Sequence, residues 1–316
     1  MSTMYAVRAH TRGGPEQLVY EQAPRPEPGP GEVLVAVKAA SMTPHELTWS
    51  ATWTNSSDGS GPERTPIIPS HEFSGVVAVS RAGVESPTEG EAVYGLIPFT
   101  RDGAAAEYVT LPAAVVAAKP ATVDHDHAAA LPLSALAAWQ ALVNHAGLQA
   151  GQHVLVQGGA GGVGSQVVQI AASLGARVSA TAAAADLEFV KGLGAEQAID
   201  YAHDRFEDHV RDVDVVIDLV GGPTQSRSWS VLKAGGVLVS PSTPPDQQEA
   251  ARHDARGVYF IVAPDPNALR SIAELVDNGR LKPVVDRVLP LTETRSGYEA
   301  LETAKLRGKI VIHVAD

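Results

Sequence analysis

The chain has 316 residues, of which 44% are hydrophobic and 19% charged, and its formal net charge is −12. This length exceeds what one hydrophobic core usually serves, so we expect two domains. Acidic and basic residues are interspersed without a Lys/Arg block, which argues against a nucleic-acid partner. No apolar run reaches the ~18–20 residues of a membrane helix, so no membrane partner is expected. The chain has no cysteine, which excludes disulfides, thiolate nucleophiles and Cys-ligated zinc.

The N-terminal segment has no basic stretch followed by an apolar block, so it does not read as a secretory signal. A cytoplasmic location is therefore expected.

The first third of the chain has the pattern of a β domain. Short apolar runs lie at residues 5–7, 33–37, 75–79, 92–96 and 107–109. Turn-forming stretches rich in proline and glycine separate them, and these predict a compact, mainly antiparallel β domain. The segment 56–69 has no hydrophobic period and is predicted to be a mobile loop.

Near residue 120 the pattern changes. Asp124 can cap a short helix, and a second helix is predicted over 134–143. From residue 151 strands and helices alternate. The strands are predicted at 153–157, 177–181, 213–219, 236–240 and 258–262, and the helices at 163–174 and 186–193. Such alternation predicts an α/β fold with a parallel sheet covered by helices on both faces. The tail is predicted to hold one helix, 266–277, and a strand, 309–314, and to pack back on the β domain.

A glycine-rich turn joins the strand 153–157 to the helix 163–174. Gly159 allows a tight turn, Gly161 removes a Cβ where a pyrophosphate must approach, and Gly164 lets the helix lie close to the sheet. The helix start then offers free N–H groups and a positive dipole to phosphates. This context favours a dinucleotide site over a glycine-rich connection without a ligand.

The end of the second strand bears on the choice of cofactor. Four alanines, residues 182–185, follow it where an NAD enzyme usually carries an Asp or Glu for the adenosine ribose, and the first carboxylate is Asp186. Without that carboxylate a 2′-phosphate is not repelled, which favours NADP(H). No Arg or Lys stands at the strand end, so a positive partner for the phosphate is missing there.

At this point the chain resembles the medium-chain dehydrogenase/reductase superfamily, and within it the zinc-independent quinone oxidoreductase branch. The matching segments are Gly13-Gly14-Pro15-Glu16, Pro28-Gly29-Pro30-Gly31-Glu32-Val33-Leu34-Val35, His71-Glu72-Phe73-Ser74-Gly75-Val76-Val77, Ala106-Glu107-Tyr108-Val109, Ala138-Trp139-Gln140-Ala141-Leu142, the glycine turn, Leu193-Gly194-Ala195, Ile199-Asp200-Tyr201 and Gly308-Lys309-Ile310-Val311.

The resemblance implies a GroES-like, β-rich catalytic domain of residues 1–122 and 263–316. A Rossmann domain of residues 123–262, with a doubly wound parallel sheet, would lie between these parts of the chain. It also implies a cofactor in the cleft between the domains and a homodimer formed by pairing sheet edges, for which residues 258–262 offer an apolar strand.

The resemblance also implies a set of cofactor-binding residues. Gly161, Gly162 and Val163 would meet the pyrophosphate, within the turn that Gly159 and Gly164 shape. The other positions are Thr181 and Tyr201 near the adenosine ribose or its phosphate, Ser240 and the stretch from Phe260 to Val262 beside the nicotinamide, and Lys309 from the tail. For Tyr201 and Phe260, packing on the sheet is an equal alternative.

The chain departs from its relatives around the expected active site. Thr43 stands where relatives often carry Asn, Ala137 stands where many carry Thr, and residues 40–60 hold no tyrosine that would donate a proton. His71-Glu72 falls where zinc-dependent relatives place a ligand, but the other ligand positions hold Thr43 and, approximately, Ser134. One histidine cannot make a site that needs three protein ligands, so no metal is expected. A new site built from His45-Glu46 and His71-Glu72 is the less favoured alternative.

Four residues of the 43–53 segment are candidates for the chemistry. Thr43 would orient a carbonyl or the nicotinamide, and His45 is the candidate proton donor unless it is a surface histidine. Trp49 and Trp53 would wall a flat apolar pocket or anchor the 56–69 loop.

The expected function is NADPH-dependent hydride transfer, without metal, to a small-molecule quinone or α,β-unsaturated carbonyl (enone). A metal-free carbonyl reductase, and a non-catalytic NADPH-binding protein with a redox-sensing or partner-binding role, remain alternatives.

Overall fold

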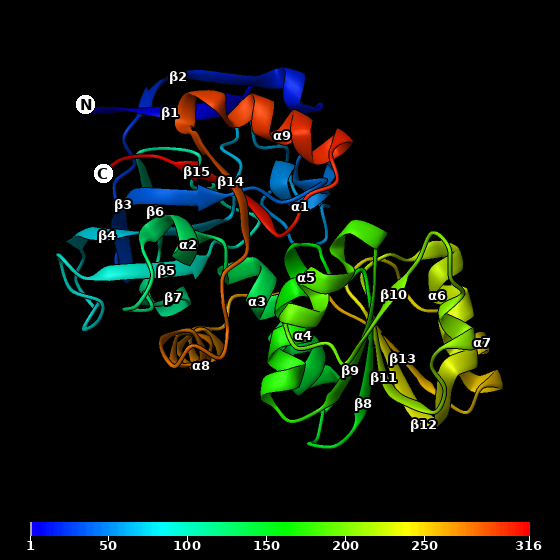
Figure 1. Ribbon diagram of the computed structural model, residues 1–316. Coiled ribbons are helices and arrows are strands. Elements are labelled where there is room, and N and C mark those ends of the chain that lie inside the picture. Colours follow the sequence, from blue (N-terminus) through cyan, green and yellow to red (C-terminus); the bar gives the residue numbers. More distant parts are fainter. Residues whose placement is uncertain (1) are drawn as a thin grey trace. The chain divides into compact units, whose positions relative to one another are not determined.

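The computed structural model describes residues 2–316, which divide by their contacts into two compact units (Figure 1). Unit 1 comprises residues 2–133, Ala263–Asp277 and Pro283–Asp316. Unit 2 comprises Ser134–Val262 and Asn278–Lys282. Among residues 2–316 no helix has both the length and the apolar character that crossing a membrane requires.

Unit 1 is built on a seven-stranded sheet in the order β14-β15-β3-β4-β5-β7, with β6 also paired to β3. Its strands are β3 (Glu32–Ser41), β4 (Glu72–Ser80), β5 (Ala92–Leu96), β6 (Tyr108–Pro112), β7 (Val116–Ala118), β14 (Val285–Pro290) and β15 (Lys309–His313). All pairs are antiparallel except β14 with β15. A separate antiparallel hairpin joins β1 (Thr3–Ala9) to β2 (Leu18–Pro24). The mainly antiparallel β domain predicted from the sequence is therefore confirmed.

Four helices belong to unit 1: α1 (Ser50–Trp53), α2 (His125–Ala129), α8 (Pro266–Asp277) and α9 (Thr294–Thr303). The Asp124 carboxylate caps α2, as expected, by accepting the His127 N–H at 2.8 Å. α2 packs against β3 and β4, so residues 123–133 group with unit 1 rather than with the parallel sheet. The tail packs in unit 1, but the expectation of one tail helix is wrong. α9 was missed because its buried stripe is only Thr294, Gly297 and Tyr298.

Unit 2 holds a six-stranded parallel sheet in the order β10-β9-β8-β11-β12-β13. Its strands are β8 (His153–Gln157), β9 (Arg177–Ala182), β10 (Gln197–Asp200), β11 (Val213–Asp218), β12 (Leu232–Ser240) and β13 (Arg256–Tyr259). Its helices are α4 (Gly162–Ser173), α5 (Leu187–Gly192), α6 (Gly222–Ser228) and α7 (Gln247–Arg252). α3 (Pro132–Trp139) begins at the boundary of the units and continues as a π-helical turn, Gln140–His145. Every residue of β8 is buried, as expected for a central parallel strand. The predicted α/β fold with a Rossmann-type sheet is confirmed.

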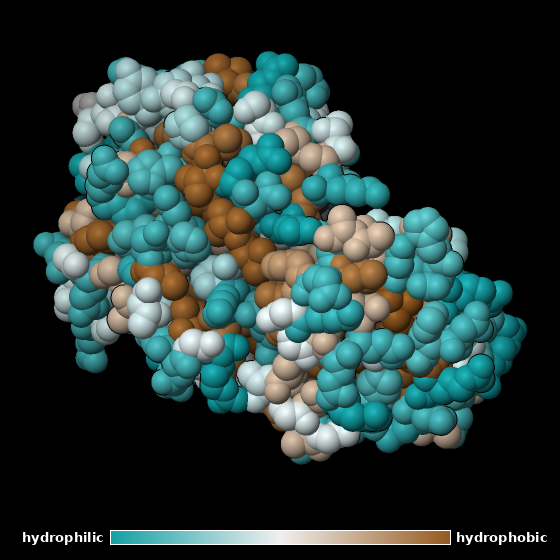
Figure 2. Space-filling view, in the orientation of Figure 1, coloured by the Kyte–Doolittle hydropathy of each residue, from teal (hydrophilic) through white to brown (hydrophobic). Residues whose placement is uncertain are grey.

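The last strand of this sheet is shorter than predicted. β13 ends at Tyr259, which pairs with Ser240 at the end of β12, so the chain beyond has no ladder partner. Phe260 instead packs on the His145 ring at a centroid distance of 4.6 Å. Ile261 is 62% exposed. In Figure 2 the visible surface is mostly hydrophilic, with hydrophobic residues in one continuous band and in several smaller groups.

Candidate functional site

The glycine turn lies between β8 and α4 in unit 2. Gly158, at φ +85°, starts it. A Cβ on Gly164 would lie 2.0 Å from the carbonyl oxygen of Gly158, and a Cβ on Gly159 would lie 2.9 Å from Cβ of Ala180. Both positions therefore require glycine for the close approach of the helix and the turn to the sheet, as the sequence analysis predicted.

Gly161 differs from the other two glycines. The nearest atom to a Cβ placed there is Gly158 O at 3.7 Å, an ordinary van der Waals contact, so a Cβ would fit beside Gly161 without a clash. α4 begins directly afterwards at Gly162, and the N–H groups of its first turn have no intrahelical acceptors. The turn thus has the open space and the donors that a pyrophosphate needs, and its residues fit a dinucleotide cofactor.

Buried polar side chains form hydrogen bonds that hold this turn in place. The Thr181 hydroxyl donates to Gln157 Oε1 at 2.9 Å and accepts the Gly158 N–H at 3.0 Å. Gln157 also donates to the Ser228 hydroxyl at 3.1 Å. Thr181 is 3% exposed, so its side chain supports the turn, and its direct contact with a cofactor stays a prediction. Gln157 was not recognised from the sequence because a polar residue that ends a strand gives no local sign of its partners.

Tyr201 lies beside the end of β9. Its backbone N–H donates to the carbonyl of Ala182 at 3.1 Å, and its side chain is 52% exposed. The exposed ring stands at the carboxyl end of the parallel strands, where open α/β sheets bind their ligands. The alternative prediction for Tyr201, that its ring packs on the sheet, is wrong because half of the residue is exposed. Ala183, next along β9, is half-buried.

The two predicted nicotinamide-side residues have protein partners. The Ser240 hydroxyl is buried and accepts the N–H groups of Ser242 and Thr243, each at 3.2 Å. Phe260 is 7% exposed and packs on His145, and Val262 is half-buried. Their roles toward a cofactor stay predictions.

In unit 1 the structure brings Thr43 and Lys309 together. Lys309 Nζ donates to Thr43 Oγ1 at 3.0 Å and lies 2.5 Å from Glu72 Oε1. The Thr43 hydroxyl donates to the same Glu72 oxygen over a longer 3.4 Å, and Glu72 Oε2 accepts the Leu133 N–H at 2.9 Å. Glu72 is fully buried and Lys309 is 4% exposed, so this is a buried ion pair with a hydroxyl attached to it.

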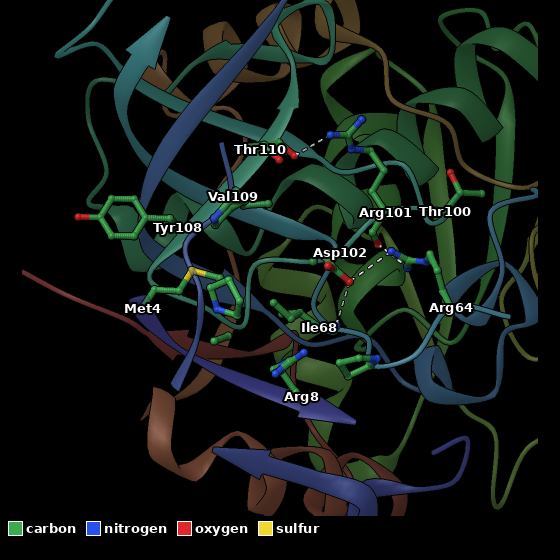
Figure 3. A pocket seen from close by; sticks show the side chains of 15 residues that line it. Met4, Arg8, Arg64, Ile68, Thr100, Arg101, Asp102, Tyr108, Val109 and Thr110 are labelled. Carbon is green, nitrogen blue, oxygen red and sulfur yellow. Dashed lines mark hydrogen bonds and ion pairs between the residues drawn. The ribbon is translucent and has the colours of Figure 1, made fainter. Parts of the chain in front are cut away.

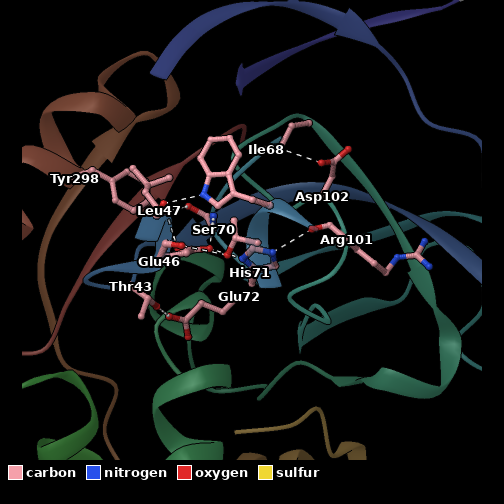
Figure 4. Close-up of polar contacts among 12 residues, drawn as sticks. Thr43, Glu46, Leu47, Ile68, Ser70, His71, Glu72, Arg101, Asp102 and Tyr298 are labelled. Atoms are coloured by element: carbon pink, nitrogen blue, oxygen red, sulfur yellow. Dashed lines mark hydrogen bonds and ion pairs between the residues drawn. The ribbon is translucent and has the colours of Figure 1, made fainter. Parts of the chain in front are cut away.

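A second buried network lies beside it, and Figure 4 shows its members pointing toward one another. Glu46 accepts hydrogen bonds from the His71 Nδ1–H, the Ser70 N–H (2.9 Å) and the Tyr298 hydroxyl (2.8 Å). Burial alone would raise the pKa of the Glu46 carboxyl, but the His71 ring and these hydrogen bonds outweigh it and lower the pKa. Burial, and then the Glu46 charge, raise the pKa of Tyr298 well above its usual value.

These contacts decide whether a zinc ion fits. The two ring nitrogens of His71 lie against the Glu46 carboxylate and, at 3.1 Å, the Arg101 carbonyl oxygen, so both already face protein oxygens rather than a common metal position. Glu72 is already paired with Lys309, and a threonine hydroxyl is a poor zinc ligand. Among residues 2–316 no group of three or more His, Asp or Glu side chains is placed to hold a metal ion. The residues therefore do not fit zinc.

The other candidates of the 43–53 segment differ in their exposure and in their partners. His45 is exposed and has a left-handed backbone, φ +63°. Trp49 is half-buried, edge-on to Phe99 at 5.1 Å. Trp53 is 1% exposed in the core, and its carbonyl accepts the Arg64 N–H at 2.7 Å. This position suits an anchor for the 56–69 segment better than a pocket wall.

Unit 1 also contains a pocket of about 430 Å³, shown in Figure 3. Its polar lining includes Arg8, Arg64, Arg101 and Asp102, and Arg64 donates to Asp102 at 3.2 Å. None of the site residues predicted from the sequence lines it.

Comparisons with known proteins agree with this fold. Residues 29–121 match the family described as "Alcohol dehydrogenase GroES-like domain", and residues 193–312 match "Zinc-binding dehydrogenase". The chain is 32% identical to a "Probable zinc-binding oxidoreductase, mitochondrial" of Arthroderma benhamiae, over 92% of each chain. It is also 32% identical to an "NADPH-dependent alkenal/one oxidoreductase, chloroplastic" of Arabidopsis thaliana, over 91% of this chain and 73% of that one. The structure of a quinone oxidoreductase from Coxiella burnetii superposes with a TM-score of 0.90 at 30% identity, covering 99% of this chain and 100% of the other.

A GroES-like β unit combined with a Rossmann-type unit that carries a dinucleotide turn defines a dehydrogenase or reductase of the medium-chain type. The chain belongs to the medium-chain dehydrogenase/reductase superfamily, in the branch of quinone oxidoreductases and alkenal/one reductases. It is an oxidoreductase of that branch, and the predicted family is confirmed. Two of these relatives are named for organelles, and the cytoplasmic location stays a prediction.

Proposed function

We propose that this protein is an NADPH-dependent reductase that transfers hydride, without metal, to an α,β-unsaturated carbonyl or a quinone. The observation that carries the proposal is the glycine turn, with open space beside Gly161 and the free N–H groups at the start of α4. The substrate class is supported by relatives named as an alkenal/one oxidoreductase and a quinone oxidoreductase.

The chain's own residues have three tasks in this reaction. Gly161, Gly162 and Val163 would hold the pyrophosphate through backbone N–H groups, and Tyr201 would lie along the adenosine ribose. Thr43 would orient the substrate carbonyl. When bound, the reduced nicotinamide supplies the hydride, so the protein needs to provide orientation and a donor for the oxygen that becomes negative.

The preference for NADPH rests on the end of β9. The strand ends at Ala182, and the next three residues are alanines, so β9 itself ends without the carboxylate that would repel a 2′-phosphate. The Arabidopsis relative is named NADPH-dependent, which supports the same choice.

Product analysis tests the proposal. Purified protein, NADPH and an α,β-unsaturated ketone are incubated and the products separated, with a quinone panel in parallel. A saturated ketone, or quinone-dependent oxidation of NADPH, supports the proposal. An allylic alcohol instead identifies a carbonyl reductase. Bound NADPH without turnover on either panel identifies a non-catalytic cofactor-binding protein.

We also propose that the protein is a homodimer that pairs through β13. This strand is the last of its sheet, with β12 on one side only, and Tyr259 is 44% exposed. Open strand edges of this kind pair readily. Light scattering with size-exclusion chromatography should give twice the mass of 32.9 kDa. Tyr259→Lys should shift the protein toward the monomer, whereas Tyr5→Lys, on the exposed β1–β2 hairpin, should not. A monomeric wild-type protein would refute the pairing.

A further inference from the structure

The proposed function gives no task to the buried ion pair of Lys309 and Glu72. Lys309 Nζ contacts one oxygen of Glu72 and the hydroxyl of Thr43, at 2.5 and 3.0 Å, and both charged side chains are almost fully buried. A buried ion pair is weak evidence for stability, because desolvation can exceed the Coulombic gain. Its attachment to a residue predicted to orient the substrate suggests a functional reason for it.

The geometry points to Thr43 as the donor to the substrate oxyanion, with Lys309 acting through it as a positioning residue. This inference rests on the proposed function. It specifies which side chains stabilise the charge that develops on the substrate oxygen, in a chain whose residues do not fit a zinc ion.

The hydrogen-bond distances explain how the Thr43 hydroxyl can donate to a substrate oxygen. Its own donation to Glu72 is long, 3.4 Å, while Lys309 satisfies the same carboxylate oxygen at 2.5 Å. Rotating the hydroxyl proton away from Glu72 therefore sacrifices only a weak hydrogen bond. Lys309 continues to donate to Thr43 Oγ1, and a hydroxyl that accepts from an ammonium group is a stronger donor in turn. Thr43 is 8% exposed, against 4% for Lys309 and 0% for Glu72, so it has the largest exposed fraction of the three.

Glu72 keeps the ammonium group in place. Its Oε2 accepts the Leu133 N–H at 2.9 Å, at the start of α3, which orients the carboxylate from the other side. Without Glu72 the lysine would be a buried, unpaired charge, and without Lys309 the carboxylate would repel an oxyanion at Thr43.

The electron and proton balance is simple. Hydride from the reduced nicotinamide forms a C–H bond at the β-carbon of the enone, and the C=C electron pair moves so that the negative charge rests on the carbonyl oxygen. Thr43 Oγ–H donates a hydrogen bond to that oxygen while Lys309 Nζ–H donates to Thr43. Water then protonates the enolate at the α-carbon. In a quinone the same donor would meet the oxygen of the hydroquinone anion.

A binding experiment tests this without turnover. 4-Nitrophenol carries its negative charge on an oxygen bonded to an sp² carbon, as an enolate does, and its ionised form is coloured. We expect the wild-type protein, with and without NADP⁺, to bind the phenolate in preference to the phenol. Thr43→Val and Lys309→Met should each weaken that preference about tenfold or more, the size of one hydrogen bond to a charged group. Thr43→Ser should restore it.

The controls separate this effect from folding. Lys309→Met leaves Glu72 unpaired and can unfold the chain, so the double variant Lys309→Met/Glu72→Gln and the uncharged change Thr43→Val are measured beside it. Lys305→Met removes an equal charge from an exposed position of the same tail and should leave phenolate binding unchanged.

Kinetics supply the second readout. On a substrate that the wild-type protein reduces, Thr43→Val should lower kcat by roughly 10²-fold, as loss of an oxyanion donor does, and Lys309→Met/Glu72→Gln should lower kcat in the same direction but by less. KM should change little, because the interaction strengthens only as charge develops.

Two results overturn the inference: no phenolate preference in the wild-type protein, or an unchanged preference in both Thr43→Val and the double variant. Failure of the proposed function looks different. The phenolate preference and its dependence on Thr43 and Lys309 would then stand, while no enone or quinone is reduced.

Discussion

The Tyr298 hydroxyl donates a hydrogen bond to Glu46 Oε2 at 2.8 Å, across a sequence separation of 252 residues. Tyr298 lies on α9 in the tail, and Glu46 lies three residues after Thr43. Both side chains are buried, at 3% and 1% exposure. The tail helix is therefore linked by a buried hydrogen bond to the segment that carries the candidate substrate residues.

Tyr298→Phe should lower the free energy of unfolding by about 1.5–3 kcal/mol, the range for a hydrogen bond to a charged group. The ring still fills the same space, so packing is kept. Urea unfolding at pH 7 measures the change. Tyr259→Phe, which removes a hydroxyl from a tyrosine that is 44% exposed, is the matched control and should have little effect. Equal effects of the two variants would show that the Glu46 contact contributes nothing.

The Glu46 network also predicts a pH dependence of stability. Burial raises the pKa of the Glu46 carboxyl, but the His71 ring and the hydrogen bonds lower it by more. The folded-state pKa of Glu46 is therefore below its ordinary value of 4.5. A carboxyl group with a depressed pKa stabilises the fold above its unfolded-state pKa. That contribution is lost as the pH falls through the folded-state pKa. Stability should therefore decrease from about pH 4.5 downward.

Glu46→Gln should make the acid limb of this profile shallower without abolishing it. The pKa values of Glu32, Asp124 and Asp214 are also lowered in the folded protein, so their contributions remain. Urea midpoints collected from pH 3 to pH 7 measure the two profiles, and identical slopes would contradict the role assigned to Glu46.

Two glycines of the turn should respond differently to alanine. Gly164→Ala places a Cβ 2.0 Å from a backbone oxygen and should destabilise the protein by about 1–3 kcal/mol, the usual cost of overpacking. Gly161→Ala meets nothing closer than 3.7 Å and should keep stability within about 0.5 kcal/mol.

Gly161→Ala should nevertheless weaken NADPH binding by about tenfold, because the new methyl group stands where the pyrophosphate approaches. Thermal unfolding and a fluorescence titration with NADPH separate the two effects. Full NADPH affinity in folded Gly161→Ala would remove this turn from the cofactor site.

The sequence predicted those parts of the molecule that depend on local pattern. β8 is a continuous buried run that is followed by a glycine turn and then by α4, so this strand–turn–helix unit was recognisable. α9 was not, because its buried stripe contains a threonine and a glycine. The contact between Lys309 and Thr43 spans 266 positions, and no local pattern indicates that two polar residues so far apart will be buried together. The end of β13 was misjudged because apolar character continues past the point where β12 stops offering a partner.

Metal removal should leave activity unchanged. Both nitrogens of His71 lie against protein oxygens, and Glu72 is held by Lys309, so both side chains are already engaged within the protein. Dialysis against a strong chelator should therefore keep kcat within experimental error, with the cofactor and substrate held constant. Stoichiometric zinc in elemental analysis of the purified protein, lost together with activity on dialysis, would contradict this expectation.

A single carboxylate at the end of β9 should change the choice of cofactor. Ala183 is half-buried and directly follows the strand, at the place where a carboxylate usually binds the adenosine ribose hydroxyls of NAD. Ala183→Asp would put a negative charge beside the 2′-phosphate of NADPH, so binding of NADPH should weaken while that of NADH improves. Titrations of both cofactors should show NADPH preferred by the wild-type protein and a shift of about fivefold or more toward NADH in the variant, since like charges at close range cost at least ~1 kcal/mol. Ala315→Asp, which adds the same charge near the C-terminus, should leave the ratio unchanged. A wild-type protein that binds NADH tenfold more tightly than NADPH would show instead that the missing carboxylate does not decide the cofactor.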